Sequence, residues 1–367
     1  MSADPDRLLF FAPNRVWRCY TGGLLLERFE AKGCPADGQF PEEWLASTTP
    51  AMNGQNQQHP TEGLSCVRNP DGSRGPLFTE LLSAHRAEWL GPGAPPAGSG
   101  VGVLCKFLDA AIRLPIQCHP DRAFAHAHFG SEHGKEEAWF ILGVRNIDGR
   151  APYLLMGFKP GTTRAAFARA VAEQDVAAME SMLHRFEARP GDAYIIPGRF
   201  PHAIGPGVFL LEVQEPTDWV VQPERRIGSV TLDEPMMWGP LDRETGLDCF
   251  DYAGAAEAHE IRKRILLRAR NGASQPGRRL ERLIDSNVSR SFRVDRLTVQ
   301  GACEFEPDTA YHIGIVVQGN GTIEVNGSSA SVRRGVSYFA PHTARTLRIT
   351  PSETPLEIFI VSGPDTR

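Results

Sequence analysis

The sequence predicts a mainly β protein in which helix is the minority. Two observations lead to this prediction: 36 glycines and 29 prolines are spread along all 367 residues, and short runs of β-branched and aromatic residues lie between them. A composition of 41% hydrophobic and 23% charged residues is typical of a globular chain with one or two hydrophobic cores. It excludes a disordered protein, a disulfide mini-scaffold and a coiled coil.

Strand-like runs occur in both halves of the chain. They are four to six residues long, which suits a strand better than a helix, and they end at glycine, proline or polar residues. We expect strands at 139–144, 194–197, 208–213, 313–317 and 356–361.

One region has helical spacing instead. Over about 163–187, Thr163 can cap a helix, and apolar residues from Phe167 to Leu183 recur at three- and four-residue intervals. We therefore expect two short helices there, inserted into a β domain and followed by the turn ARPGD.

These features divide the chain into three parts. We expect a β domain over 1–235 with the helical insertion, a linker over 236–285, and a second β domain over 286–367. The linker is charged and alanine-rich, and its helix should end near Asn271 and Gly272. Short alternating strands joined by glycine and asparagine turns make the last part a small separate β-sandwich.

Charge and cysteine content limit the partners and the compartment. The formal net charge of -5 gives no attraction for phosphate backbones or anionic lipid, so we expect neither nucleic acid nor a membrane as partner. The start MSADPDRLLFFAPNR lacks the pattern of an export signal, and no apolar run is long enough to span a bilayer. Seven scattered cysteines without CxxC spacing favour a reducing cytoplasm. We expect a monomer or homodimer.

Residues that can bind a metal recur at strand spacing. In LPIQCHPD, Gln117 and His119 alternate with apolar neighbours, so on a strand both side chains would point to one face. Glu137 opens another strand with Lys135 on the same face, and His202 lies on a turn after a further strand. Two imidazoles, a carboxylate and an amide oxygen suit a divalent ion, with zinc as first candidate. However, a buried histidine is often only a hydrogen-bonded core residue, and a QxH pair also occurs by chance.

Other histidines are weaker candidates. His126, His128 and His133 lie in RAFAHAHFGSEHG, which lacks strand alternation and suits a short helix or loop, so we expect these side chains to be exposed. His312 and His342 have no second ligand at strand spacing, and we expect the C-terminal domain to bind no metal.

Several motifs together resemble type I phosphomannose isomerase, a zinc-dependent cupin enzyme that interconverts mannose 6-phosphate and fructose 6-phosphate. The strings KFLDAAIRLPIQCHPDRAFAHAHFGSEHGKEEAWFIL and RPGDAYIIPGRFPHAIGPGVFLLEVQEPTD carry the resemblance, with NRVWRCYTGG and PEEWLAS matching more loosely. The resemblance implies a catalytic cupin, or jelly-roll, barrel and a metal-free second cupin-like domain. It also implies one Zn²⁺ held by Gln117, His119, Glu137 and His202.

Two positions depart from the family pattern. Pro115 stands where the family usually has the serine of LSIQ, and Gln222 stands at the position of a strand-end arginine. Because a phosphate dianion is normally held by charge-assisted or bidentate contacts, both departures weaken the expected phosphate site. The side chains expected to contact the substrate are Gln222 itself, Lys106, Arg199, Arg225 and Arg226.

The isomerisation implied by the resemblance proceeds through an enediol and needs a general base. Lys135, Glu212 and Asp121 are candidates if the barrel interior tunes one of them for proton transfer near neutral pH. Lys135 could equally pair with a neighbouring glutamate, and Glu212 could support a metal-bound histidine. Two alternatives stay open: a cupin isomerase for an unphosphorylated or modified sugar, and a cupin that binds a sugar without turning it over.

Overall fold

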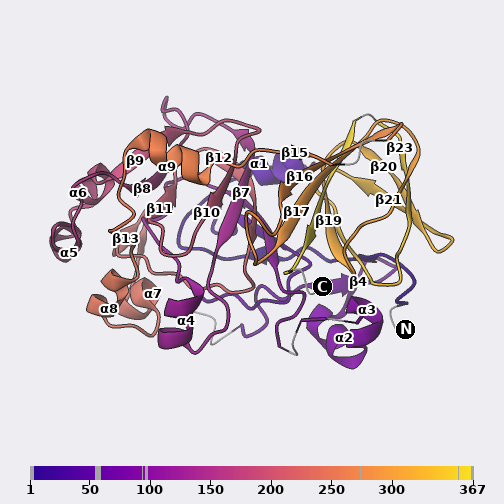
Figure 1. The fold of residues 1–367 in the computed structure, drawn as a ribbon, viewed down its shortest axis with the longest axis horizontal. Helices are drawn as coiled ribbons and strands as arrows, with labels where there is room; N and C mark the ends of the chain where they lie inside the picture. The colour runs from indigo at the N-terminus through magenta and orange to yellow at the C-terminus, as the bar shows by residue number, and fades with distance from the viewer. Residues whose placement is uncertain are drawn as a thin grey trace.

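The computed structural model describes residues 4–53, 59–92, 94–95, 98–272, 275–353 and 355–364. It is mainly β, as the sequence predicts, and two groups of sheets lie next to each other (Figure 1). The five strands expected from the apolar runs are all present, as parts of β7, β10, β12, β19 and β24. No helix in the described ranges is long and apolar enough to cross a membrane.

The first group is built around a six-stranded sheet with the order β10-β7-β12-β6-β3-β2. A three-stranded sheet, β11-β8-β9, shares one buried hydrophobic cluster with it. The strands of these two sheets are β2 (Arg15–Val16), β3 (Glu42–Leu45), β6 (Leu104–Asp109), β7 (Glu137–Val144), β8 (Tyr153–Phe158), β9 (Leu183–Glu187), β10 (Ala193–Ile196), β11 (His202–Ile204) and β12 (Val208–Gln214). Two hairpins add β4 (Cys66–Arg68) with β5 (Arg74–Leu77), and β13 (Arg226–Ile227) with β14 (Val230–Thr231).

The second group contains a seven-stranded and a four-stranded sheet. The larger sheet has the order β1-β22-β19-β24-β17-β16-β15, and the smaller has the order β18-β23-β20-β21. Their strands are β1 (Leu9–Phe10), β15 (Arg270–Asn271), β16 (Arg278–Ile284), β17 (Arg293–Val299), β18 (Cys303–Phe305), β19 (His312–Gln318), β20 (Asn320–Val325), β21 (Ser328–Arg333), β22 (Ser337–Ala340), β23 (Leu347–Pro351) and β24 (Leu356–Ser362).

Short helices lie around these sheets (Figure 1). They are α1 (Leu24–Phe29), α2 (Phe78–Ala84), α3 (Arg86–Leu90), α4 (Arg122–Phe129), α5 (Arg164–Glu173), α6 (Val176–Ser181), α7 (Glu234–Trp238), α8 (Arg243–Asp248) and α9 (Ala258–Ile265).

The strand β1 connects the start of the chain to the C-terminal sheet. Leu9 pairs with Phe339 and Phe10 pairs with Tyr338, so the first strand forms the edge of the seven-stranded sheet. In Figure 1 the amino terminus accordingly lies beside the orange and yellow strands. Aromatic contacts continue across the junction, with the ring centroids of Phe140 and Phe359 5.0 Å apart. The two groups of strands therefore share buried surface.

The helical insertion is shorter than the sequence suggests. Helices α5 and α6 are present, and the Thr163 hydroxyl caps α5 by accepting the Ala166 N–H at 3.1 Å. The expectation of helix up to residue 187 is wrong, because Leu183–Glu187 is strand β9 paired with β8. Leu183 and Phe186 are buried there, and a spacing of three fits either a helix or a short irregular strand.

The linker helix also ends earlier than expected. Helix α9 stops at Ile265, and residues 270–271 form β15 instead of a helix end. The chain leaves the helix because Leu266 bridges to Tyr194 and the Leu267 N–H donates to the Ala193 carbonyl, which extends the backbone along β10.

The expected strand around Gln117 and His119 is an extended segment with two isolated bridges. Gln117 pairs with His202 and Cys118 pairs with Val221. No regular ladder forms here, because Pro115 and Pro120 lack an N–H and the Ile116 N–H donates to the Glu224 carboxylate at 2.6 Å.

Candidate metal centre

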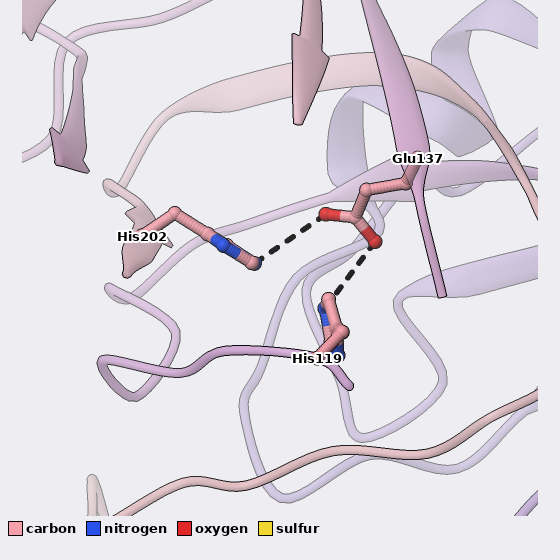
Figure 2. Close-up of side chains that lie close together, drawn as sticks. All are labelled: His119, Glu137 and His202. Atoms are coloured by element: carbon pink, nitrogen blue, oxygen red, sulfur yellow. Dashed lines mark ion pairs between the residues drawn. The ribbon is translucent and has the colours of Figure 1, made fainter. Parts of the chain in front are cut away.

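Three segments that are distant in sequence bring His119, Glu137 and His202 together. Glu137 is the first residue of β7, as expected, whereas His202 is the first residue of β11 and not part of a turn. The Nε2 atom of His119 lies 3.3 Å from Oε2 of Glu137, and Nε2 of His202 lies 3.4 Å from Oε1. Figure 2 shows both imidazoles pointing at the carboxylate. One ligand atom from each residue can be chosen so that all lie within 4.8 Å of one another.

Backbone carbonyls orient both imidazoles. The Nδ1 atom of His119 lies 2.8 Å from the Trp219 carbonyl oxygen, and Nδ1 of His202 lies 2.8 Å from that of Phe200. A carbonyl only accepts, so Nδ1 must carry the proton in each ring and Nε2 has a free lone pair facing Glu137. Metal-binding histidines typically have this tautomer and this kind of outer contact.

Burial keeps the two rings neutral. It lowers the pKa of His202 to about 3, and burial together with the Lys135 ammonium lowers the pKa of His119. Burial alone would raise the pKa of Glu137, but the charge of its neighbours, including the Lys135 ammonium, holds it well below its usual range. Two neutral imidazoles beside an ionised carboxylate are the protonation states that a metal site requires.

Unsatisfied polar atoms indicate that these residues fit a cation. Both carboxylate oxygens of Glu137 and Nε2 of His202 are buried without a hydrogen-bond partner. Leaving such atoms unpaired is costly, and a divalent ion between them would satisfy all three. Nitrogen and oxygen donors in this combination suit Zn²⁺.

Gln117 lies next to the cluster through its backbone. Its N–H donates to the His202 carbonyl, and the His202 N–H donates to the Gln117 carbonyl, both at 2.9 Å. Residues that face each other in an antiparallel bridge have their side chains on the same side. The Gln117 side chain is therefore on the side from which His202 reaches Glu137, which makes its amide oxygen a candidate fourth ligand.

A second group of buried charges adjoins the cluster on the six-stranded sheet. Glu212 of β12 lies directly opposite Lys106 of β6 and Trp139 of β7, so these side chains share one face. The Lys106 ammonium is 2.9 Å from Oε1 of Glu212, and the Trp139 indole N–H donates to Oε2 at 3.0 Å. Burial and the nearby Glu137 raise the pKa of Glu212, although Lys106 opposes the shift.

Lys135 contacts the metal-binding atoms themselves. Its ammonium nitrogen lies 3.1 Å from Nε2 of His119 and 3.5 Å from Oε2 of Glu137. The sequence expectation that Lys135 and Glu137 share a face is consistent with this contact.

The remaining predicted site residues are engaged elsewhere. The Asp121 carboxylate caps α4 by accepting the Phe124 N–H at 2.8 Å. Arg199 donates to the Asp248 carbonyl at 2.9 Å, Arg225 pairs with Glu234 at 2.6 Å on the surface, and the Gln222 amide donates to the Met236 carbonyl at 2.8 Å. Arg226 lies exposed in β13. None of these side-chain contacts reaches the His119, Glu137 and His202 cluster in the described part of the chain, although the Arg199 backbone N–H donates to the His119 carbonyl.

Sequence reasoning missed three charged residues near the cluster, namely Arg18, Glu42 and Asp218. Arg18 pairs with Glu42 at 3.0 Å and with Asp218 at 3.2 Å, and Lys106 lies 3.7 Å from Glu42. Burial would raise the pKa of Glu42, but the cations of Arg18 and Lys106 lower it to about 2. The alternation of Glu42 with Trp44 in PEEWLAS is the signal that could have identified this strand as facing the site.

Comparison with known proteins agrees with this geometry. No protein-family model matches the chain. A Bacillus subtilis (strain 168) protein named "Probable mannose-6-phosphate isomerase GmuF" is 31% identical over 279 residues, which are 76% of this chain and 80% of that protein. The crystal structure of the mannose 6-phosphate isomerase from Bacillus subtilis superposes with a TM-score of 0.73 at 19% identity and covers 96% of this chain and 99% of its own.

A zinc-bound holo structure of a mannose 6-phosphate isomerase is also similar in fold. Its TM-score is 0.71 at 13% identity, and the match covers 98% of this chain and all (100%) of that one. The two solved structures confirm the predicted mainly β cupin fold class. An identity above 30% over most of both chains shows a shared family and not only a shared fold. The chain belongs to the mannose-6-phosphate isomerase family.

Proposed function

We propose that this chain is a zinc-dependent isomerase that interconverts mannose 6-phosphate and fructose 6-phosphate through an enediol. The observation that carries the proposal is the convergence of His119, Glu137 and His202, in which the buried Glu137 oxygens and Nε2 of His202 lack hydrogen-bond partners. Relatives that carry this activity in their names, and a zinc-bound structure of the same fold, support the same ion and reaction.

Negative charge forms on the sugar oxygens when a proton leaves the carbon beside the carbonyl. A bound divalent ion supplies positive charge that stabilises these oxygens. With Glu137 as its one anionic ligand and Gln117, His119 and His202 as neutral ligands, the site keeps net positive charge for this purpose.

We assign the proton-carrying role to Glu212. The raised pKa of Glu212 lies closer to neutral pH, which is the range in which a general base works best. The Trp139 indole and the Lys106 ammonium fix both of its oxygens in place. Lys135, beside His119 and Glu137, is suited to hold the developing oxyanion of the substrate by a charge-assisted hydrogen bond. Asp121 is a weaker candidate because its carboxylate already caps α4.

One observation favours a second substrate class. Gln222 replaces the cation expected at a strand end, and its amide is bonded to the Met236 carbonyl. If no other cation binds the phosphate, the same site would act on an unphosphorylated sugar. Lys106, Arg199, Arg225 and Arg226 are the proposed substitutes, and of these Lys106 pairs with Glu212 beside the cluster.

The experiment is an isomerase assay on the purified chain with mannose 6-phosphate, fructose 6-phosphate and the free sugars, with and without a chelator. We expect turnover of the phosphorylated pair, loss of activity with the chelator and recovery with Zn²⁺. His119→Ala and His202→Ala should remove bound zinc and activity. His128→Ala, on the exposed side of α4, is the matched control. Undiminished activity after chelation would refute the metal role, and turnover of free sugars alone would favour the second class.

We also propose the wider setting of the enzyme. The substrate is a small sugar phosphate, nucleic acid is not a partner, and the protein is a monomer or homodimer. The seven cysteines are free, which supports a cytoplasmic location. Residues 1–235 would form the catalytic domain and 286–367 a metal-free domain, joined by 236–285, with β1, β15 and β16 from outside 286–367 completing the sheet of the second domain.

A further inference from the structure

The orientation of His119 depends on a carbonyl in an irregular segment. Trp219, whose carbonyl accepts the Nδ1–H of His119 at 2.8 Å, follows β12 in a stretch without regular secondary structure. A carbonyl in such a stretch is not fixed by a sheet ladder, so other contacts must hold its direction. The Val221 pairing with Cys118 fixes one side of Trp219. Asp218 lies on the other side.

Asp218 is held mainly by Arg18. The two terminal nitrogens of the Arg18 guanidinium lie 3.2 Å from Oδ2 and 3.2 Å from Oδ1 of Asp218, which is a bidentate pairing. The Met52 N–H adds a third bond to this carboxylate at 2.8 Å. Only 8% of the Asp218 side chain is exposed, so the pair is shielded from competing water.

Arg18 is in turn fixed by the six-stranded sheet. Its Nε lies 3.0 Å from Glu42 at the start of β3, and its guanidinium carbon lies 5.2 Å from the centre of the Trp44 ring. One further nitrogen contact goes to the Asn53 amide oxygen at 2.9 Å. These contacts hold the Arg18 guanidinium between groups of the protein itself. It is therefore a rigid link within the structure and is not free to bind a ligand.

We infer that Arg18 is a positioning residue for the metal centre. It connects β3 to Asp218, Asp218 fixes the neighbouring Trp219 carbonyl, and that carbonyl sets the tautomer and direction of His119. The inference rests on the metal site of the proposed function. Outer contacts of metal-bound histidines commonly change metal affinity by 10- to 100-fold, and a planar bidentate guanidinium fixes a carboxylate better than a lysine can.

The test measures metal affinity and does not need turnover. The apo form of the full chain is titrated with Zn²⁺ against a chromophoric chelator, and the visible spectrum of the Co²⁺-loaded protein is recorded. We expect Arg18→Met and Asp218→Asn each to weaken Zn²⁺ binding about 10-fold and to change the cobalt spectrum. Arg18→Lys should recover part of the affinity. The double variant of Arg18→Met and Asp218→Asn should bind Zn²⁺ no more weakly than the weaker-binding single variant, because both residues act through one contact.

A matched control separates this role from general loss of charge. Arg164 also bridges two carboxylates, Asp248 at 2.6 Å and Glu244 at 2.9 Å, but on the surface. Arg164→Met should leave Zn²⁺ affinity and the cobalt spectrum unchanged.

The outcomes distinguish the inference from the proposed function. If the unmodified chain binds no Zn²⁺, the proposed function fails first. If it binds Zn²⁺ and the Arg18 and Asp218 variants bind equally well, the positioning role alone is overturned. A higher Michaelis constant for mannose 6-phosphate in Arg18→Met with unchanged Zn²⁺ affinity would also overturn it, because Arg18 would then act on the substrate. Should Arg18→Met fail to fold, the Zn²⁺ affinities of Arg18→Lys and Asp218→Asn still test the positioning role.

Discussion

The buried pair of Lys106 and Glu212 gives a sharp energetic prediction. The two charged atoms are 2.9 Å apart, and about 4% of each side chain is exposed. At an effective dielectric constant of about 20, their gross attraction is about 6 kcal/mol, most of which offsets the cost of removing both charges from water. Removing one partner leaves the other charge buried, which typically costs about 3–5 kcal/mol.

The two single variants should lose similar amounts of unfolding free energy. Glu212→Gln leaves the Lys106 ammonium with Glu42 at 3.7 Å, so we expect a loss near 3 kcal/mol. Lys106→Met leaves Glu212 with the Trp139 N–H and close to Glu137, and we expect a loss of the same order. The double variant removes both charges, so it should be destabilised by little more than either single variant. The coupling energy should then be at least about 2 kcal/mol.

Urea unfolding of the four proteins, followed by tryptophan fluorescence with chelator present, measures this coupling. The surface pair of Glu187 and Arg189, whose side chains are 59% and 63% exposed, is the control and should couple by less than about 1 kcal/mol. Additive losses for Lys106 and Glu212, within about 0.5 kcal/mol, would show that burial does not couple the two charges and would refute the reasoning.

Three further outcomes follow from the site. The pKa of Glu42 is about 2, below its ordinary 4.5, so the ionised group stabilises the fold above about pH 4.5 and this contribution is lost as the pH falls towards 2. Glu42→Gln should therefore flatten the acid side of a pH-dependent unfolding curve, and an unchanged slope would contradict the assignment. Zn²⁺ should raise the melting temperature of the chelated protein, and His202→Ala should abolish that shift in differential scanning calorimetry. Gln222→Arg should lower the Michaelis constant for mannose 6-phosphate in a coupled assay, and no change would indicate that phosphate is bound elsewhere or not at all.

Much of the β structure could be predicted because it depends on local sequence. Strands β7, β12, β19 and β24 are continuous apolar runs that no amphipathic helix of that length would show. The errors fall where two patterns overlap. Leu183–Glu187 has buried residues at a spacing of three and follows a helix, so only its pairing with β8 makes it a strand.

The candidate metal residues could be predicted from the sequence, but the orientation of their side chains could not. Spacing and residue type made His119, Glu137 and His202 candidates, and the family resemblance singled them out as a ligand set. The Trp219 and Phe200 carbonyls that fix the imidazoles belong to backbone, which has no sequence signature. The link from Arg18 to Asp218 joins residues 200 positions apart and could be seen only after the chain had folded.

The β1 strand makes the C-terminal region incomplete as an independent unit. A fragment beginning at residue 286 would lack β1, β15 and β16, and the outer backbone groups of β22 and β17 would face solvent unpaired. Open strand edges recruit other chains, so such a fragment should self-associate. In the whole chain, β1 can pair only after β22, more than 300 residues later, has been synthesised, which makes this pairing a late event in folding.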